Sequence, residues 1–189
     1  EISIPATIES KPVIAIEQFA FSDCRTLSSI TIPSSVTSIG NDAFSACYSL
    51  KSITFGADSQ LQSIGDGAFF NCDLTSITIP SSVKLIGSDA FHSCQFESVM
   101  IPSSVTSIGR NAFLGCSRLT SITVDPNNSN YSSVDGVLFN KDINELIQYP
   151  AGNTSTSYSI PDSVTSIRES AFRFCHNLKN VTVGADSKL

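Results

Sequence analysis

The chain has 189 residues, of which 41% are hydrophobic and 15% are charged, and its formal net charge is −6. Its 11 lysines and arginines are scattered, whereas binding to nucleic acid or to an anionic membrane surface needs such residues in clusters. No apolar run approaches the roughly 20 residues that cross a bilayer, so we expect no membrane insertion in this segment.

One phrase recurs along almost the whole chain. Its Ala-Phe pair returns at steps of 23, 25, 22 and 22 residues and then after a gap of 59. The gap holds one degenerate copy, with Val134 in the isoleucine position and Leu138-Phe139 in the Ala-Phe position. Self-similarity at such a period is typical of solenoids. With Phe139, seven phenylalanines are therefore expected in one register. The other six belong to the pairs Ala20-Phe21, Ala43-Phe44, Ala68-Phe69, Ala90-Phe91, Ala112-Phe113 and Ala171-Phe172.

Each repeat begins with an apolar cluster that predicts a strand. In one copy this cluster comprises Leu27, Ile30 and Ile32, and Pro33 follows it. The alternation of apolar and polar residues is that of a strand with one buried face. The strand is expected to be short, because proline lacks the backbone donor that a longer strand needs.

The second cluster of each repeat predicts a short helix. Val36 and Ile39 indicate an extended stretch, Gly40 a turn, and the segment from Ala43 to Cys47 one or two turns of α- or 3-10 helix. A single unit cannot bury both clusters, whereas stacked units form continuous apolar columns. We therefore predict an α/β fold, a strand-rich solenoid of about seven coils over residues 1–189. Its short strands should be parallel, with short helical or 3-10 turns and a right-handed course.

The consensus of these copies, Cys-x-x-Leu-x-x-Ile-x-Ile-Pro-x-x-Val-x-x-Ile-Gly-x-x-Ala-Phe, resembles the BspA-type (Treponema pallidum-type) leucine-rich repeat. The resemblance covers nearly the whole chain. It implies an extracellular or cell-surface protein of anaerobic, often host-associated bacteria, and adhesion to host matrix or to other cells. Two positions depart from the pattern: Arg168 replaces the turn glycine of the last copy, and Asp142 replaces the cysteine of the degenerate copy.

The end of the chain copies an earlier segment. Residues 183–189 repeat the pattern of residues 55–61, after which the earlier copy continues into the next part of its repeat. The sequence thus stops within a repeat, and solenoids need polar caps at their ends. We expect the chain to be a fragment of a longer array.

The least repetitive stretch, residues 125–160, predicts an insertion in the degenerate coil. Asp125 to Ser133 is expected to be a polar loop, because it is rich in turn-forming residues. Residues 137–140 and 145–149 flank residues 141–144 as the strands of a β-hairpin that leaves the coil. The strand of this coil is then Tyr158-Ser159-Ile160-Pro161 rather than the segment ending at Tyr149-Pro150. We expect this stretch to contribute specificity.

Each cysteine lies three residues after a motif phenylalanine, which predicts one repeated environment for reduced, buried thiols. No metal or cofactor is expected, because no Cys-x-x-Cys motif occurs and histidine is too sparse. The segments 125–128 and 135–136 do not match the ligand spacing of a calcium loop. The cysteines are Cys24, Cys47, Cys72, Cys94, Cys116 and Cys175.

No active site is expected. His92 and His176 lie several coils apart, so a shared catalytic triad is disfavoured. Asp42, Asp66 and Asp89 form an approximate column before the Ala-Phe pairs, which could suggest paired catalytic acids. Capping of the predicted helical turns explains this column better, since carboxylates accept from exposed N–H groups there.

The strands predict a polar outer face on which a protein partner could bind. Because Ile30 and Ile32 point inward, Ser29 and Thr31 point outward, and successive coils extend them into a serine row and a threonine row. Met100 interrupts the threonine row and is the sharpest candidate contact. The alternative is a merely soluble surface. The predicted partner-binding face comprises Ser52, Thr54, Ser76, Thr78, Ser98, Met100, Ser121 and Thr123.

The predicted function is protein–protein interaction or adhesion by a monomer at the cell surface or outside the cell. Two alternatives remain: a structural spacer or stalk without a ligand of its own, and an accessory repeat module of a larger secreted enzyme.

Overall fold

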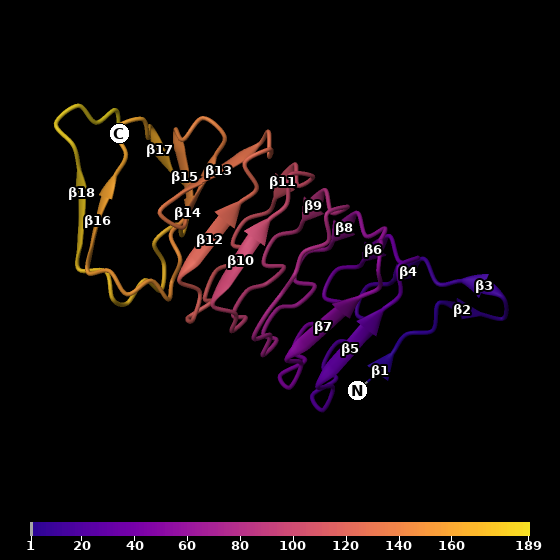
Figure 1. The fold of residues 1–189 in the computed structure, drawn as a ribbon. Coiled ribbons are helices and arrows are strands. Elements are labelled where there is room, and N and C mark those ends of the chain that lie inside the picture. Colours follow the sequence, from indigo (N-terminus) through magenta and orange to yellow (C-terminus); the bar gives the residue numbers. More distant parts are fainter. Residues whose placement is uncertain (1) are drawn as a thin grey trace.

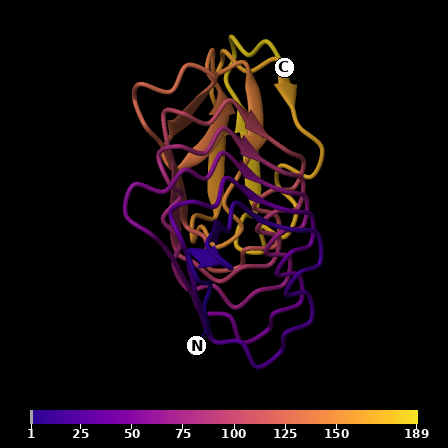
Figure 2. The same ribbon diagram turned by 90° about the vertical axis from the view of Figure 1, so that its right-hand side faces the viewer.

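A computed structural model of the chain describes residues 2–189, which form a strand-rich solenoid of about seven turns (Figure 1). Seen from the N-terminal end, successive coils lie over one another (Figure 2). Most regular coils contribute one strand to each of two parallel columns. An N-terminal hairpin of β2 (Thr7–Ile8) and β3 (Lys11–Pro12) precedes the regular coils.

The first strand column consists of three parallel groups. The first group is β1 (Ile2–Ser3), β5 (Ser29–Ile32) and β7 (Ser52–Phe55), and the second is β10 (Ser98–Ile101) with β12 (Ser121–Val124). The third is β16 (Ser157–Ile160) with β18 (Asn180–Val183). The predicted strand of the degenerate coil is thus confirmed at β16. One coil, residues 75–79, has no assigned strand between β7 and β10.

The second strand column is more regular. Five strands pair in parallel in the order β11 (Ser107–Ile108), β9 (Leu85–Ile86), β8 (Ser63–Ile64), β6 (Ser38–Ile39) and β4 (Ala15–Ile16). Beyond them lies a four-stranded sheet in the order β13 (Tyr131–Val134), β14 (Val137–Asn140), β15 (Glu145–Gln148) and β17 (Ser166–Ile167). In it β15 pairs in parallel with β17, so β15 continues the second column.

The prediction of short helical turns is wrong. The segments around the Ala-Phe pairs form non-helical turns, and residues 2–189 contain no helix. Their backbone N–H groups alternate between two directions. Phe44 donates to Ala68 O of the next coil at 2.8 Å, whereas Ser45 donates to Asp42 O within its own turn at 3.1 Å. A helix needs every N–H directed along its own axis. The solenoid instead uses every second one to join coils, so the fold is a β-solenoid rather than α/β.

The capping role predicted for the aspartates is also wrong. Asp42 has a φ of 52°, a left-handed conformation in which Asp, Asn and Gly are favoured. Asp66 is not in register with Asp42, because it occupies the position that Asn41 has one coil earlier. Asn41 Oδ1 accepts a hydrogen bond from the N–H of Asp66 at 2.9 Å, and Asp66 Oδ1 accepts one from the N–H of Ser88 at 2.7 Å. These side chains join successive coils, and no paired-acid site results.

The predicted phenylalanine column is confirmed over five coils. Phe44 and Phe69 stack with ring centroids 5.2 Å apart, and Phe69 and Phe91 with centroids 5.5 Å apart. The column continues at its two ends to Phe21 and Phe113. All of these rings except Phe21 are buried, so burial of equivalent side chains in columns stabilises the coils.

The register predicted for the degenerate coil is wrong. Tyr149 N–H donates to Ala171 O at 2.9 Å, as the motif phenylalanines donate to the alanine of the next coil, so Tyr149 rather than Phe139 occupies the phenylalanine position. Leu146, paired with Ile167, occupies the isoleucine position that the sequence assigned to Val134. The apolar interior correspondingly divides into two clusters, and Phe139 and Tyr149 lie in the second.

The prediction of one environment for the cysteines is confirmed for the four buried thiols, whereas Cys24 and Cys175 are only half-buried. All six thiols are free, and five donate a hydrogen bond to the backbone carbonyl of the aromatic residue one coil earlier. The Sγ···O distances are 3.0 Å from Cys47 to Phe21, 3.1 Å from Cys72 to Phe44, 3.3 Å from Cys94 to Phe69, 3.1 Å from Cys116 to Phe91 and 3.8 Å from Cys175 to Tyr149.

Candidate binding surface

The predicted partner-binding face lies on the outer side of the first strand column. Within each paired group the rows are in register: Thr31 pairs with Thr54, and Met100 pairs with Thr123. Seven of the eight predicted residues are exposed, and Ser121 is half-buried. Met100 is 57% exposed in a row of hydroxyl side chains. The surface is therefore polar and nearly uncharged, with one apolar side chain near its middle.

A gap interrupts this face at the coil that carries Ser76 and Thr78. A cavity of about 430 Å³ opens there, between the end of β7 and the neighbouring coil. Ile53, Phe55 and Asp58 line one side of the cavity, and Thr78 and Pro80 line the other. The structure thus brings Thr54 and Thr78 to one cavity, which the sequence rows do not predict.

The C-terminal end of the face is closed by a hairpin. β13 and β14 pair antiparallel around Asp135-Gly136, so the loop predicted at 125–133 gives way to a strand at Tyr131. β14 and β15 pair antiparallel on the two sides of residues 141–144, as the sequence predicts. The prediction that this hairpin leaves the coil is wrong, because β15 pairs in parallel with β17 of the next coil. The hairpin of β13 and β14 covers the edge of β12 that does not pair with β10. Ile122 N–H donates to Gly136 O at 2.8 Å, and Val124 N–H donates to Ser133 Oγ at 3.1 Å.

Asn128 anchors the loop that leads into this hairpin. Its side chain is fully buried; its amide donates to Pro102 O at 2.8 Å and Val105 O at 3.0 Å. Its Oδ1 accepts the N–H groups of Asn130 and Tyr131, both at 2.8 Å. These bonds use the side-chain oxygen that a calcium ion would need, so the segment serves as a structural anchor.

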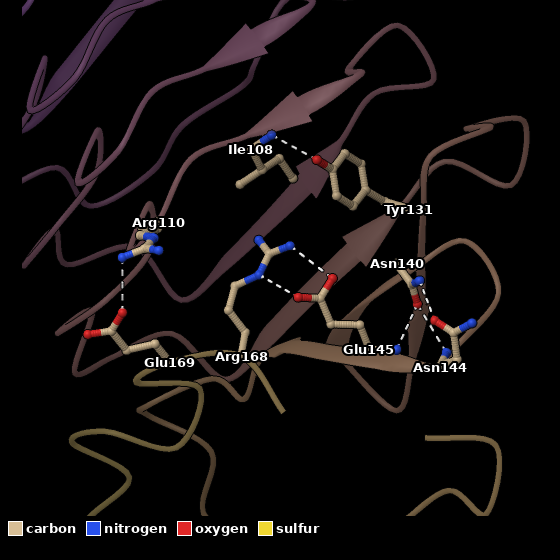
Figure 3. Close-up of polar contacts among 8 residues, drawn as sticks. All are labelled: Ile108, Arg110, Tyr131, Asn140, Asn144, Glu145, Arg168 and Glu169. Atoms are coloured by element: carbon tan, nitrogen blue, oxygen red, sulfur yellow. Dashed lines mark hydrogen bonds and ion pairs between the residues drawn. The ribbon is translucent and has the colours of Figure 1, made fainter. Parts of the chain in front are cut away.

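Charged residues line the junction between the two parts of the second column (Figure 3). Arg168 forms two hydrogen bonds of 3.0 Å with Glu145, and Arg110 pairs with Glu169 at 3.1 Å. Nearby, Tyr131 Oη accepts the N–H of Ile108 at 2.8 Å. All four charged side chains line a cavity of about 630 Å³. Because each arginine is already paired with a glutamate, the cavity offers no free positive charge to an anion.

Both histidines line one cavity of about 280 Å³, although they are far apart in the sequence. His92 Nδ1 lies 2.8 Å from Asp89 Oδ1, an arrangement that could orient a catalytic imidazole. Within residues 2–189, however, no hydrogen bond joins either imidazole to a serine hydroxyl. No group of three potential metal ligands occurs in that range either.

Burial favours the protonated form of three thiols. It raises the pKa of Cys94 well above its ordinary value, raises that of Cys116 to about 12 and raises that of Cys175 to about 11. A thiol must ionise to act as a nucleophile or a metal ligand. Cys94 and Cys116 are accordingly part of the packed interior, and the half-buried Cys175 packs against it.

The chain matches the family model described as a BspA type leucine-rich repeat region, in six copies, over residues 1–60, 55–155 and 149–188. A search of curated protein sequences finds no match.

Several solved structures are similar. A leucine-rich repeat protein from Eubacterium ventriosum is 31% identical with a TM-score of 0.86, over 93% of this chain and 46% of that one. The pneumococcal vaccine antigen PcpA is 29% identical with a TM-score of 0.76, over 98% and 55%. A leucine-rich repeat protein of T. pallidum is 28% identical with a TM-score of 0.65, over 100% and 69%. The chain spans about half the length of the first two.

Among residues 2–189, no helix has the length and apolar character that a membrane crossing requires.

The stacked columns, the repeated cysteine environment and the family match over nearly the whole sequence agree with one another. The chain belongs to the BspA-type family of leucine-rich repeat proteins.

Proposed function

We propose that this chain is a non-enzymatic interaction module that acts at a cell surface or outside the cell. It binds a protein of the host matrix or of another cell through the outer face of the first strand column. The observation that supports this most is the exposed side chain of Met100 on a regular, nearly uncharged surface. Leucine-rich repeats usually mediate protein interactions, which fits this assignment.

The chemistry of the face suits a protein partner. Hydroxyl side chains such as Thr54 and Thr123 can both donate and accept hydrogen bonds. Met100 supplies an adaptable apolar side chain, and methionine is enriched in the buried centre of protein interfaces. Fully burying a side chain of this type is worth about 1.5–3 kcal/mol, so one contact could decide whether binding is detected.

Two relatives support the proposed location. One is the pneumococcal vaccine antigen PcpA, and another, from Faecalibacterium prausnitzii, is described as a leucine rich cell surface protein. The second is 27% identical over 95% of this chain, with a TM-score of 0.54.

Capture from host matrix or from co-resident bacterial cells, with the purified chain as bait, tests the proposal. Met100→Glu should weaken capture of the main partner at least tenfold, because it places a charge in the centre of the face. Leu85→Glu is the matched control, since Leu85 is 42% exposed but belongs to the second strand column. Equal capture by both folded variants would overturn the proposed face and favour the spacer role.

A further inference from the structure

Two neighbouring coils of the first strand column separate beside β7. In residues 2–189 no backbone hydrogen bond joins β7 to residues 76–80, and none joins those residues to β10. Just before the gap the coils still touch, because Thr75 N–H donates to Lys51 O at 3.1 Å. The gap therefore opens beside β7, and in Figure 1 no arrow of the first strand column lies between β7 and β10.

The free edge of β7 turns polar backbone groups into this gap. In a parallel ladder, alternate residues direct their N–H and C=O groups to opposite neighbours. Gly56 N–H donates to Ile32 O of the preceding coil at 2.8 Å, so Thr54 shares that direction. Ile53 and Phe55 accordingly direct their backbone groups away from β5 and toward the gap.

The gap also reaches the apolar interior. Ile53, Phe55 and Ile77 point inward but are only half-buried, whereas Ile30 and Val99, at equivalent positions of paired strands, are at most 2% exposed. The cavity of about 430 Å³ lies over this region. An occupant could thus combine backbone hydrogen bonds with burial of apolar side chains.

The gap coincides with differences in the length of the repeats. The connection from Phe55 to Ile64 is two residues longer than that from Ile32 to Ile39. The turn from Cys72 to Leu74 is one residue shorter than the corresponding turn of the coil before it. The extra residues project at Asp58, whose φ is 55°, while the next coil enters its strand early.

The chain itself shows what occupies such an edge. At β12 the corresponding groups, Ile122 N–H and Val124 N–H, bond to the inserted hairpin at Gly136 O and Ser133 Oγ. We propose that the edge of β7 binds an extended polypeptide segment of a protein partner in the same way. The segment hydrogen-bonds to the backbone of Ile53 and Phe55 and places apolar side chains in the cavity.

This assignment rests on the proposed function and specifies its partner. Recognition by addition of a strand derives affinity from the backbone and specificity from alternate side chains. Asp58 is the only charged residue that lines the cavity, so the best segment carries a lysine or arginine opposite it and is otherwise uncharged. A folded partner surface without an extended segment cannot enter a gap of this kind.

The test uses a synthetic peptide with the sequence of residues 28–35, Ser-Ser-Ile-Thr-Ile-Pro-Ser-Ser. This sequence already pairs with β7 on its other edge, so its side-chain spacing is suitable. In the free protein, the amide hydrogens of Ile53 and Phe55 should exchange at least tenfold faster than that of Ile122. Saturating peptide should slow their exchange at least tenfold. A peptide N-methylated at alternate amides should have no effect.

Thr78→Trp, which fills the cavity from the opposite coil, should weaken peptide binding at least tenfold. Thr123→Trp, on a fully paired strand of the same face, should leave it unchanged. Slow exchange at Ile53 in the free protein, absence of peptide binding, or equal binding by both variants would overturn the inference. If the peptide does not bind but Met100→Glu still weakens capture of the partner, only strand addition at β7 is refuted. If Met100→Glu leaves capture unchanged, the proposed binding face is refuted instead.

Discussion

Replacing Phe69 by alanine should destabilise the solenoid severely. Phe69 is fully buried, and its ring stacks on Phe44 at 5.2 Å and on Phe91 at 5.5 Å. Truncation of a buried phenylalanine costs about 3–5 kcal/mol through lost burial and the cavity that remains. The upper part of this range is expected, because each stacked pair adds about 0.5–1.5 kcal/mol beyond burial.

Urea unfolding followed by circular dichroism measures this loss. Phe174→Ala is the matched control, because Phe174 is 39% exposed and stacks in no column, so its loss should cost less than about 1 kcal/mol. If Phe69→Ala lowers the free energy of unfolding by no more than the control does, the phenylalanine column is not what holds the coils together.

Four further substitutions test particular side chains. Tyr149→Phe should raise the free energy of unfolding by about 1 kcal/mol, because its buried hydroxyl has no partner, whereas Tyr131→Phe should lower it by a similar amount. Asn128→Ala should cost at least about 2 kcal/mol in urea unfolding, since four backbone groups lose their partner; a smaller cost would contradict the anchoring role. Stability should fall as the pH rises from about 9 toward 12, because the buried Cys116 thiol, with its pKa raised to about 12, stays protonated only in the folded chain. Cys116→Ala should reduce this fall, and an unchanged pH profile would count against it.

The columns could be predicted because a repeated sequence creates a repeated environment. Phe44 and Phe69 recur with the same neighbours, so their stacking follows once the period is recognised. The cysteine environment followed from the same argument. The outward direction of Met100 followed from strand alternation, and its exposure agrees with that prediction.

The turn conformation could not be predicted from local spacing. The segment from Ala43 to Cys47 has apolar residues at helical intervals, but stacked turns require the same interval. The outcome depends on whether Phe44 N–H finds a carbonyl in its own turn or in the next coil, and that carbonyl lies 24 residues away at Ala68. Local patterns contain no information on this choice.

The degenerate coil was misread because Leu138-Phe139 imitates the Ala-Phe motif. The backbone hydrogen bonds place Tyr149 in that position, and tyrosine there gave no signal in the sequence. The gap beside β7 was missed for a different reason. Its length changes near Asp58 are visible in the sequence, but whether a coil absorbs them or separates from its neighbour depends on packing.

Oxidation of Met100 tests the central functional claim most directly, because it is the single methionine of the chain and lies on the proposed face. Dilute peroxide converts an exposed methionine to its sulfoxide, and mass spectrometry follows the rate at this one site. The account predicts that the captured partner slows oxidation of Met100 at least fivefold at saturation. The same rate with and without bound partner would contradict it.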